Sequence, residues 1–502
     1  MTPPSTRLAN EVLADIQGFI TSGYGHLPFA AYFPIELRDP VRTQRWLERL
    51  LPATTSSQPW PVAPGGVKVK PAESLNIAFT AGGLSACRLP PEVLCTFPPE
   101  FREGIAHEDR SRILGDTEES APAAWEYGGP GSRPLHALLI VHADSEERLA
   151  AACRAQRALI EETAGGVVSD GIQTGYRPES DCEPFGFRDG IAQPPIAGLS
   201  GAGVPTGEFI LGYQNHYGLV PPTPVVPAVL DPGAVLPPLV NPYHASQHAR
   251  DLGINGSYLV YRKLQQDVGG FWQFMKRESV RTTGAEDAAY MVWLASRFVG
   301  RWPSGAPLIL APDADDPREG SRDDFYYGGD ADGLACPLGA HIRRANPRDL
   351  LKPYSNAESL SMSAAHRLLR RARAFGPPLF DPRILQAPTA NASRKALLEL
   401  TDDGQARGVH FFCVNASIKS QFEFVQQTWC NNPRFGGLND NKDPIVGDNN
   451  RIDQPPSRMT IPRAPIRART EALPRFVTVR AGAYLFMPSL TAIRFLAGFR
   501  GH

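Results

Sequence analysis

The feature that most constrains the fold is a strand followed by a helix, which occurs in both halves of the 502-residue chain. In the first half, the apolar run at residues 135–145 predicts a strand, and the periodicity of residues 145–163 predicts a helix. In the second half, residues 408–417 repeat the strand pattern, and residues 418–432 repeat the amphipathic helix. The repeat predicts two related units that each combine strands and helices.

Each unit also has an earlier partner strand, predicted at residues 74–83 in the first half and at residues 256–267 in the second. The second of these strands leads directly into a further predicted helix, GGFWQFMK. Elements in this order favour two antiparallel sheets with peripheral helices. We therefore predict an α+β fold with two halves, residues 1–245 and residues 246–502.

Proline-rich and acidic segments separate the predicted elements. Residues 218–242 carry so many prolines that neither a helix nor a central strand is expected there. Residues 312–333 are rich in Asp and Gly, and residues 53–71 form a smaller candidate loop. The 49 prolines are about twice the average usage, which agrees with many stiff connections.

Composition and charge argue against several classes of protein. The formal net charge of -1 at pH 7 favours no nucleic-acid partner, and no window approaches the roughly 18 uninterrupted apolar residues of a membrane span. The 7 cysteines form no Cys-x-x-Cys pair, so zinc and iron–sulfur sites lack their usual spacing. Residues 1–17 have no apolar core of signal-peptide length, which predicts a cytoplasmic protein. These patterns leave the oligomeric state unknown.

One carboxylate lies between two glycines in the stretch FGFRDGIAQP, residues 185–194. Asp189 follows Gly186 by three positions and directly precedes Gly190. An ordinary turn explains such residues, because Gly and Asp tolerate unusual backbone angles. The alternative is that the glycines let the backbone carry the acid close to a flat cofactor.

A histidine that could act with this acid lies in CPLGAHIRRANPR, residues 336–348. His341 follows small residues that leave room for a flat group, and it precedes three arginines that suit carboxylates. A lone histidine is nevertheless more often an ordinary surface or core residue than a ligand.

The third stretch, AAHRLLRRARAFGPPLF, covers residues 364–380. Its apolar residues share roughly one helical side and its arginines cover the others, which predicts a solvated basic helix. The helix is expected to end at Gly376 and Pro377.

Together, these three stretches resemble the dye-decolourising peroxidase family of haem proteins. Residues 185–194 are similar to the family's Gly-x-x-Asp-Gly motif at Gly186, Asp189 and Gly190. Residues 336–348 resemble its axial-histidine segment, and RRARAFGP resembles its distal-arginine segment.

Three further segments, at residues 14–26, 407–435 and 475–497, also look like family segments, so the resemblance covers most of the chain. It implies two ferredoxin-like halves, of which the second holds most of the haem. The first half would carry the Gly-x-x-Asp-Gly motif, and the second would carry the axial histidine and the distal arginine.

The resemblance also implies how the cofactor is bound. His341 is expected to be the axial ligand of the iron of haem b (iron protoporphyrin IX), and Arg343 to contact the same cofactor. Gly186 and Gly190 are expected to let the backbone approach the haem edge. Glu423 is the candidate acceptor for the second imidazole nitrogen of His341, because such an acceptor raises the basicity of the ligand.

The catalytic residues implied by the resemblance are Asp189 and Arg370, the latter six positions before Gly376. Asp189 would move a proton on hydrogen peroxide, and Arg370 would stabilise developing negative charge.

The implied function is a haem-dependent peroxidase that reduces hydrogen peroxide and oxidises small aromatic reductants, such as phenols or dyes. One alternative is a protein that binds haem or handles haem iron, with incidental peroxidase activity. Another is a catalytically silent scaffold, because similar α+β halves host unrelated functions.

Overall fold

The computed structural model describes residues 7–199, 203–239, 248–449 and 451–500. Its first half forms an antiparallel sheet of β1 (Phe29–Leu37), β2 (Glu73–Phe79), β3 (Ala137–Ala143), β4 (Val167–Ser169) and β5 (Gln173–Tyr176). Strand β3 lies between β2 and β1, and β1 also pairs with β4 and β5. Helices α3 (Pro40–Leu50) and α8 (Glu146–Glu161) follow β1 and β3 and pack on the outer face of this sheet.

The second half forms a sheet in the order β13-β8-β10-β9 from β8 (Ser257–Gln266), β9 (Leu369–Phe375), β10 (Gly408–Asn415) and β13 (Val477–Met487). Helices α9 (Val268–Thr283) and α10 (Ala288–Val299) follow β8. Two π-helical segments, η8 (Lys419–Glu423) and η9 (Val425–Cys430), follow β10. Both halves therefore have the strand order of a ferredoxin-like unit, which confirms the predicted duplicated α+β fold.

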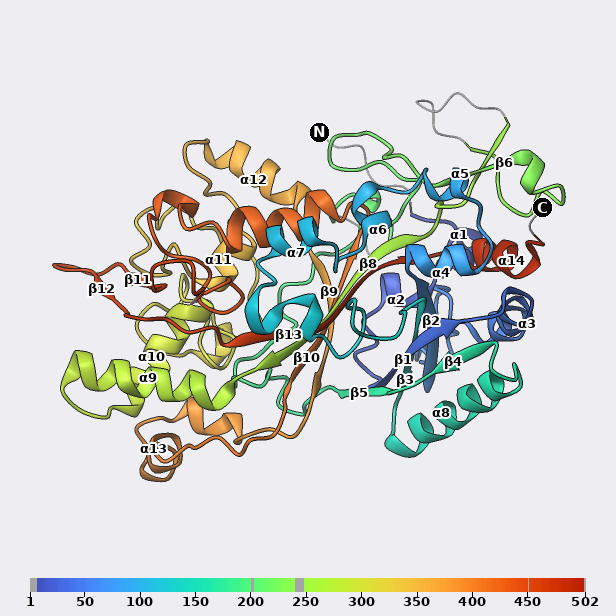
Figure 1. Ribbon diagram of the computed structural model, residues 1–502. Helices are drawn as coiled ribbons and strands as arrows, with labels where there is room; N and C mark the ends of the chain where they lie inside the picture. Colours follow the sequence, from blue (N-terminus) through green and yellow to red (C-terminus); the bar gives the residue numbers. More distant parts are fainter. Residues whose placement is uncertain (1–6, 200–202, 240–247, 450, 501–502) are drawn as a thin grey trace.

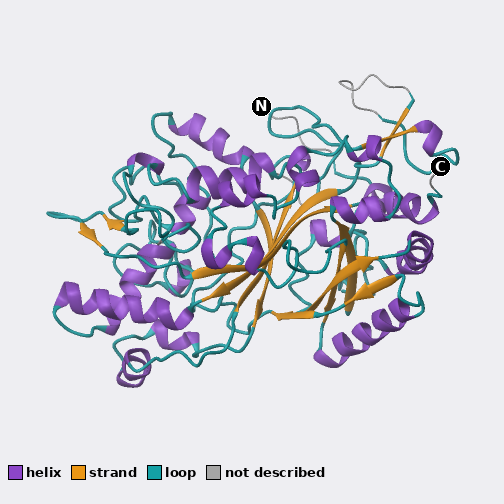
Figure 2. Cartoon of the chain, in the orientation of Figure 1, coloured by secondary structure: helices purple, strands orange, loops and turns teal. Residues whose placement is uncertain are grey.

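The two sheets join at both edges, as Figure 1 and Figure 2 show. A single residue pair links β13 to β2, and another links β5 to β9. The inner faces share one core, in which Tyr32 and Ile140 of the first sheet are buried with Tyr261 and Phe412 of the second. This packing fixes the second sheet, so its outer face can serve as a rigid wall.

Alternation along the strands decides which residues form that wall. On β10, His410 and Phe412 contact Tyr32 in the inner core, whereas Val409 and Phe411 line a cavity on the opposite face.

Shorter elements surround the sheets. The remaining helices are α1 (Asn10–Asp15), α2 (Gly18–Thr21), α4 (Ala81–Ala86), α5 (Pro91–Leu94), α6 (Pro99–Glu103), α7 (Glu108–Leu114), α11 (His341–Ala345), α12 (Asn356–Ala365), α13 (Asn391–Leu398) and α14 (Leu490–Gly498). Two small ribbons pair β6 (Val225–Pro227) with β7 (Ala249–Asp251) and β11 (Thr460–Ile461) with β12 (Ala468–Arg469). Throughout the described ranges, the helices are too short or too polar to cross a membrane.

Most predicted elements are confirmed, and the structure identifies them as β2, β3, β8, β10, α8, α9 and the π-helical segments after β10. In the proline-rich segment 218–242, where neither a helix nor a central strand was predicted, the structure has the short ribbon strand β6 and a 3-10 helix of three residues, Ala228–Leu230. The last three residues of the segment lie outside the described part. The predicted boundary between residues 245 and 246 also lies outside the described residues, so it stays a prediction.

The predicted basic helix at residues 364–380 is wrong. Helix α12 ends at Ala365, and Leu369–Phe375 form strand β9. Pairing along β10 outweighs the helical preference of the Leu, Arg and Ala residues, because seven consecutive residue pairs join the two strands. The strand conformation places alternate arginines on opposite faces of the sheet.

Candidate functional site

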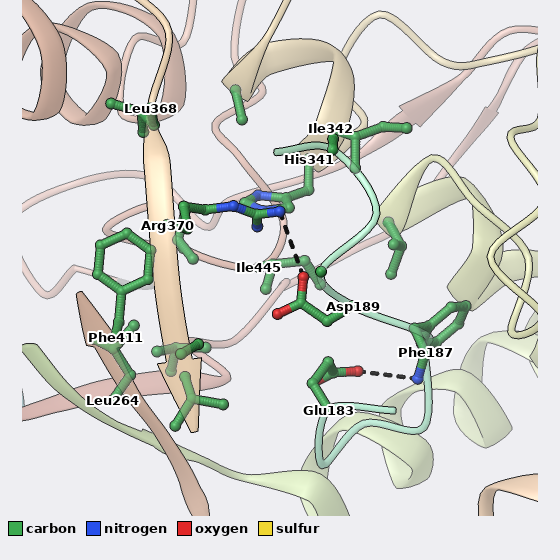
Figure 3. A pocket seen from close by; sticks show the side chains of 18 of the residues that line it. Glu183, Phe187, Asp189, Leu264, His341, Ile342, Leu368, Arg370, Phe411 and Ile445 are labelled. Carbon is green, nitrogen blue, oxygen red and sulfur yellow. Dashed lines mark hydrogen bonds and ion pairs between the residues drawn. The ribbon is translucent and has the colours of Figure 1, made fainter. Parts of the chain in front are cut away.

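A cavity of about 780 Å³ lies on the outer face of the second sheet. Its walls come from β8, β9, β10 and β13, the loop around Asp189, helix α11 and segment η9. Cofactor and ligand pockets typically enclose about 300–1,000 Å³, so this cavity has room for a large flat group. Apolar side chains form much of its wall, including Leu264, Ile342, Leu368, Phe411 and Ile445 (Figure 3).

His341 is the first residue of α11 and lines this cavity. Its Nδ1 donates a hydrogen bond to Oδ2 of Asp443 at 2.9 Å. Oδ1 of Asp443 accepts the backbone N–H groups of Ile445 at 2.8 Å and Val446 at 3.0 Å. The carboxylate thus fixes the tautomer and direction of the imidazole and leaves Nε2 available to a ligand.

His341 and Asp443 each stabilise the charged form of the other. Burial lowers the pKa of His341, but the charge and hydrogen bond of Asp443 outweigh burial, so the pKa is raised overall. Burial raises the pKa of Asp443, but the charge and hydrogen bond of His341 outweigh it, so that pKa is lowered. Asp443 therefore remains an ionised acceptor for the imidazole N–H.

Asp189 and Arg370 face each other in the same cavity (Figure 3). Nη2 of Arg370 lies 3.5 Å from Oδ1 of Asp189. The backbone N–H of Arg370 donates to Oε1 of Gln193 at 3.0 Å, and the backbone N–H of Asp189 donates to the carbonyl of Asp181 at 2.9 Å. Strand β9 and the Asp189 loop therefore hold the two charges opposite each other.

The structure brings Asp189, Arg370 and His341 to one cavity, although these residues span more than 180 positions in the sequence. The pKa of His341 responds to the charges of both Arg370 and Asp189, which places all three within electrostatic reach. The site therefore combines a candidate ligand, an acid and a fixed positive charge.

The two glycines of the motif have different roles. Gly190 has φ +79°, lines the cavity, and has open space where a Cβ would stand. Gly186 has φ +100°, but a Cβ there would lie 2.5 Å from Leu385 and 3.0 Å from the ring of Phe380. Gly186 does not line the cavity as Gly190 does, so the predicted cofactor contact at Gly186 stays a prediction.

The contacts of Arg343 do not favour its predicted cofactor contact. Nη1 of Arg343 donates to Oδ2 of Asp330 at 2.9 Å, and Nη2 donates to the carbonyl of Asp330 at 2.8 Å. The guanidinium also lies 4.5 Å from the ring centroid of Tyr327, and the side chain is 2% exposed. Arg343 therefore fixes the loop before α11 and does not line the cavity.

Glu423 is not the acceptor for His341. Its carboxylate accepts hydrogen bonds from Tyr484 at 2.8 Å and from Arg110 at 3.0 Å. Asp443 takes the predicted role from the segment after η9, and no sequence pattern around Asp443 indicates a ligand-orienting acid.

Arg367 is a cavity residue that sequence reasoning did not select. Its side chain lines the cavity, and it has no hydrogen bond or ion pair with any other residue that the structure describes. Burial lowers the pKa of Arg367, and the positive charges of Arg348 and Arg370 act in the same direction. The charge of Asp323 opposes them, but that carboxylate forms its ion pairs with Arg301 and Arg348. A partly buried guanidinium without an acid partner fits a carboxylate of a bound ligand.

These residues fit haem. His341 offers one imidazole nitrogen, Arg367 offers an unpaired guanidinium, and Ala372 and Phe411 line an apolar wall between the sheet and the cavity. Haem needs these three features, which are an axial base, partners for its propionates and apolar walls for its ring.

The comparisons with known proteins agree with this geometry. No protein-family model matches the chain. The dye-decolorizing peroxidase AauDyP1 of Auricularia auricula-judae is 29% identical over 501 residues, covering 95% of this chain and 86% of that protein. The dye-decolorizing peroxidase msp1 of Mycetinis scorodonius is 26% identical, covering 85% of this chain and 77% of that protein.

Solved structures show the same similarity. The crystal structure of AauDyP complexed with imidazole has a TM-score of 0.72 and 26% identity, covering 97% of this chain and 99% of that chain. A dye-decolorizing peroxidase in complex with 2,6-dimethoxyphenol has a TM-score of 0.72 and 23% identity over the same shares of the two chains, which shows the shared fold.

Proposed function

Because this chain belongs to the dye-decolourising peroxidase family and is a haem peroxidase, we propose that His341 binds the haem iron and that Asp189 and Arg370 act on hydrogen peroxide. The relative in Auricularia auricula-judae is named a dye-decolorizing peroxidase, and a solved structure of such a peroxidase holds 2,6-dimethoxyphenol, so we assign a small aromatic reductant to this chain. Haem supplies the redox chemistry, and the protein supplies its ligand, a proton acceptor and a fixed charge.

The cofactor we propose is haem b. The sequence has no Cys-x-x-Cys-His motif, so it does not indicate the thioether attachment of a c-type haem. Nε2 of His341 would bind the iron, and Asp443 would keep the proton on Nδ1. Arg367 would pair with a propionate, in place of the predicted Arg343.

Asp189 moves the proton. Its carboxylate would accept a proton from one oxygen of hydrogen peroxide and return it to the other oxygen, which could then leave as water when the O–O bond breaks. The two electrons that this cleavage consumes would come from the haem, when it is bound. Arg370 stabilises the negative charge that develops while this proton moves, because its guanidinium is fixed at β9 and always charged. The Asp189–Arg370 pair in the same cavity as His341 is the observation that carries this proposal.

The alternative, a protein that only handles haem or its iron, is not favoured. Binding requires His341 and Arg367, but it does not require an acid and an arginine paired inside the cavity. Relatives named as peroxidases over most of the chain point in the same direction.

The direct test compares Asp189→Asn with the wild-type protein at equal haem content. Asn keeps the shape of the side chain but accepts no proton, so the second-order rate constant for hydrogen peroxide should fall by about two to three orders of magnitude. Stopped-flow absorption of the haem band measures this rate. An unchanged rate constant would remove Asp189 from the mechanism.

A further inference from the structure

The loop that carries Asp189 encloses a half-buried carboxyl group, Glu183, which lines the cavity (Figure 3). Its Oε2 accepts the backbone N–H of Phe185 at 3.0 Å, and its Oε1 accepts the backbone N–H of Phe187 at 3.1 Å. The backbone N–H of Glu183 donates to the carbonyl of Phe187 at 2.9 Å. One side chain thus binds the loop on both sides of Gly186, and the second of these contacts, at Phe187, lies two residues before Asp189.

The same carboxyl group ties this loop to the second sheet. Nε2 of Gln266, the last residue of β8, donates to Oε2 of Glu183 at 2.6 Å. Glu183 therefore accepts three hydrogen bonds, of which two come from the loop and one from the sheet that also carries Arg370. The contact fixes the loop relative to that sheet.

The contacts of Glu183 hold the backbone of the loop and do not reach the Asp189 carboxylate itself. Arg370, at 3.5 Å, is the only described residue that pairs with that carboxylate. The backbone of the loop is bound at Asp189 and Arg188, whose N–H groups donate to the carbonyls of Asp181 and Pro303. The position of the Asp189 side chain therefore depends on the backbone that Glu183 organises.

We propose that Glu183 is the positioning residue of Asp189, because it holds the Asp189 loop at a fixed place against β8 through Gln266. This proposal rests on the role assigned to Asp189 under the proposed function. Glu183 does not exchange a proton with peroxide in this scheme, and its effect on the reaction passes through Asp189.

A glutamine cannot replace this glutamate. Both carboxyl oxygens accept hydrogen bonds in the ionised form, and a protonated carboxyl oxygen still accepts while it donates. The NH₂ group of an amide accepts none, so in Glu183→Gln it would face the N–H of either Phe185 or Phe187. At least one loop contact is lost although the side chain keeps its size.

The first experiment measures the rate constant for hydrogen peroxide in Glu183→Gln at full haem content. We expect a fall of about 10- to 100-fold, because small displacements of a reacting group cost rates of that order. Turnover limited by the reductant and the haem absorption spectrum should stay unchanged. The matched control is Glu179→Gln, which changes an exposed glutamate four residues earlier that no described contact involves.

The second experiment separates positioning from general damage to the protein. In an Asp189→Ala background, Glu183→Gln should cause no further fall, because the residue through which it acts is gone. An equal further fall in that background would overturn the proposal, and so would an unchanged rate constant in the single variant. If Asp189→Ala alone has no effect, it is the proposed function that fails.

Gln266→Leu tests the contact to the sheet even if Glu183→Gln does not fold. It removes one of the three donors and leaves both loop contacts. We expect a smaller fall, about three- to tenfold, which is again absent in the Asp189→Ala background. An unchanged rate constant in Gln266→Leu would show that the hydrogen bond from Gln266 to Glu183 does not help to position Asp189.

Discussion

Two of the pairs of a carboxylate and a basic side chain at the cavity, His341 with Asp443 and Arg370 with Asp189, differ in how firmly they are held. His341 and Asp443 are joined at 2.9 Å, and the Asp443 side chain is 0% exposed. Arg370 and Asp189 lie 3.5 Å apart, and their side chains are 28% and 39% exposed. The first pair is a closed contact, and the second pair is open to small molecules in the cavity.

The backbone around each acid accounts for this difference. Asp443 receives two backbone N–H groups in addition to His341, so its carboxylate has little freedom. The Asp189 carboxylate is paired with Arg370 alone among the described residues. A ligand for iron must keep one direction, whereas an acid that moves a proton must be able to exchange partners. We therefore call His341 and Asp443 the holding side of the cavity, and Asp189 and Arg370 its reacting side.

Replacing the proposed iron ligand His341 should have the largest effect on haem binding and on activity. His341→Ala should lose the characteristic absorption band of bound haem and reduce peroxidase activity to background. Absorption spectra of the purified variant and the wild type, each supplied with haem during expression, measure this. A full haem band in the variant would move the axial ligand to another residue.

Removing the charge on the reacting side should leave haem binding intact. Arg370→Leu should lower the rate constant for hydrogen peroxide by about two to three orders of magnitude, because a fixed donor to the developing charge is lost. Stopped-flow absorption at equal haem content gives the rate. Arg383→Leu, at an arginine whose side chain is 83% exposed, serves as the control and should behave as wild type.

Weakening the holding side without removing the ligand should have an intermediate effect. Asp443→Asn keeps a hydrogen-bond acceptor for Nδ1 of His341 but removes the negative charge. Residues that orient a metal ligand typically contribute about 10- to 100-fold in affinity or activity, so we expect a loss in that range and a higher reduction potential of the haem. Spectroelectrochemical titration measures the potential, and an unchanged potential would contradict this role of the Asp443 charge.

The proposed contact of Arg367 with a haem propionate should have the smallest effect on the reaction with peroxide. Arg367→Met should speed the transfer of haem to an excess of apomyoglobin by about tenfold, because one charged hydrogen bond is lost. The rate constant for peroxide, measured before haem leaves, should change little. Arg367→Lys keeps the charge and should lie between Met and the wild type, and equal transfer rates in all three would remove the propionate contact.

The sequence predicted the elements of the fold better than the contacts of the site. The strands and helices follow from local periodicity, which is why β3, α8 and β10 lie where the pattern places them. Strand β9 was missed because its Leu, Arg and Ala residues suit a helix, and only its pairing with β10 makes it a strand. That pairing is not visible in the stretch itself.

The site shows the same limit at the level of single residues. Asp189, His341 and Arg370 lie in motifs, and the structure brings them to one cavity. The acceptor Asp443 is 102 positions from His341, so only the folded chain shows which of many acids reaches the imidazole. Arg343 seemed suited to a propionate by its charge, but Asp330 already binds it.

The carboxyl group of Glu183, next to the reacting side, should make the stability of the protein depend on pH. Burial raises the pKa of Glu183 to about 7 from the ordinary value of 4.5, against its three hydrogen bonds, and the charge of Asp189 adds to the rise. Between these two values the folded protein keeps a proton that the unfolded chain releases. The free energy of unfolding should therefore fall as pH rises through this window, by about 3 kcal/mol in all.

Glu183→Gln should remove this dependence, because an amide does not titrate there. Denaturant unfolding of the haem-loaded protein at pH 5 and pH 7.5 would measure the change in the free energy of unfolding. Because the other acids are the same in both proteins, their contribution cancels in the difference between wild type and variant. Wild type should lose stability relative to the variant as pH rises, and the exposed Glu179→Gln should run parallel to wild type. Parallel curves for Glu183→Gln and wild type would mean that Glu183 is ionised throughout this range.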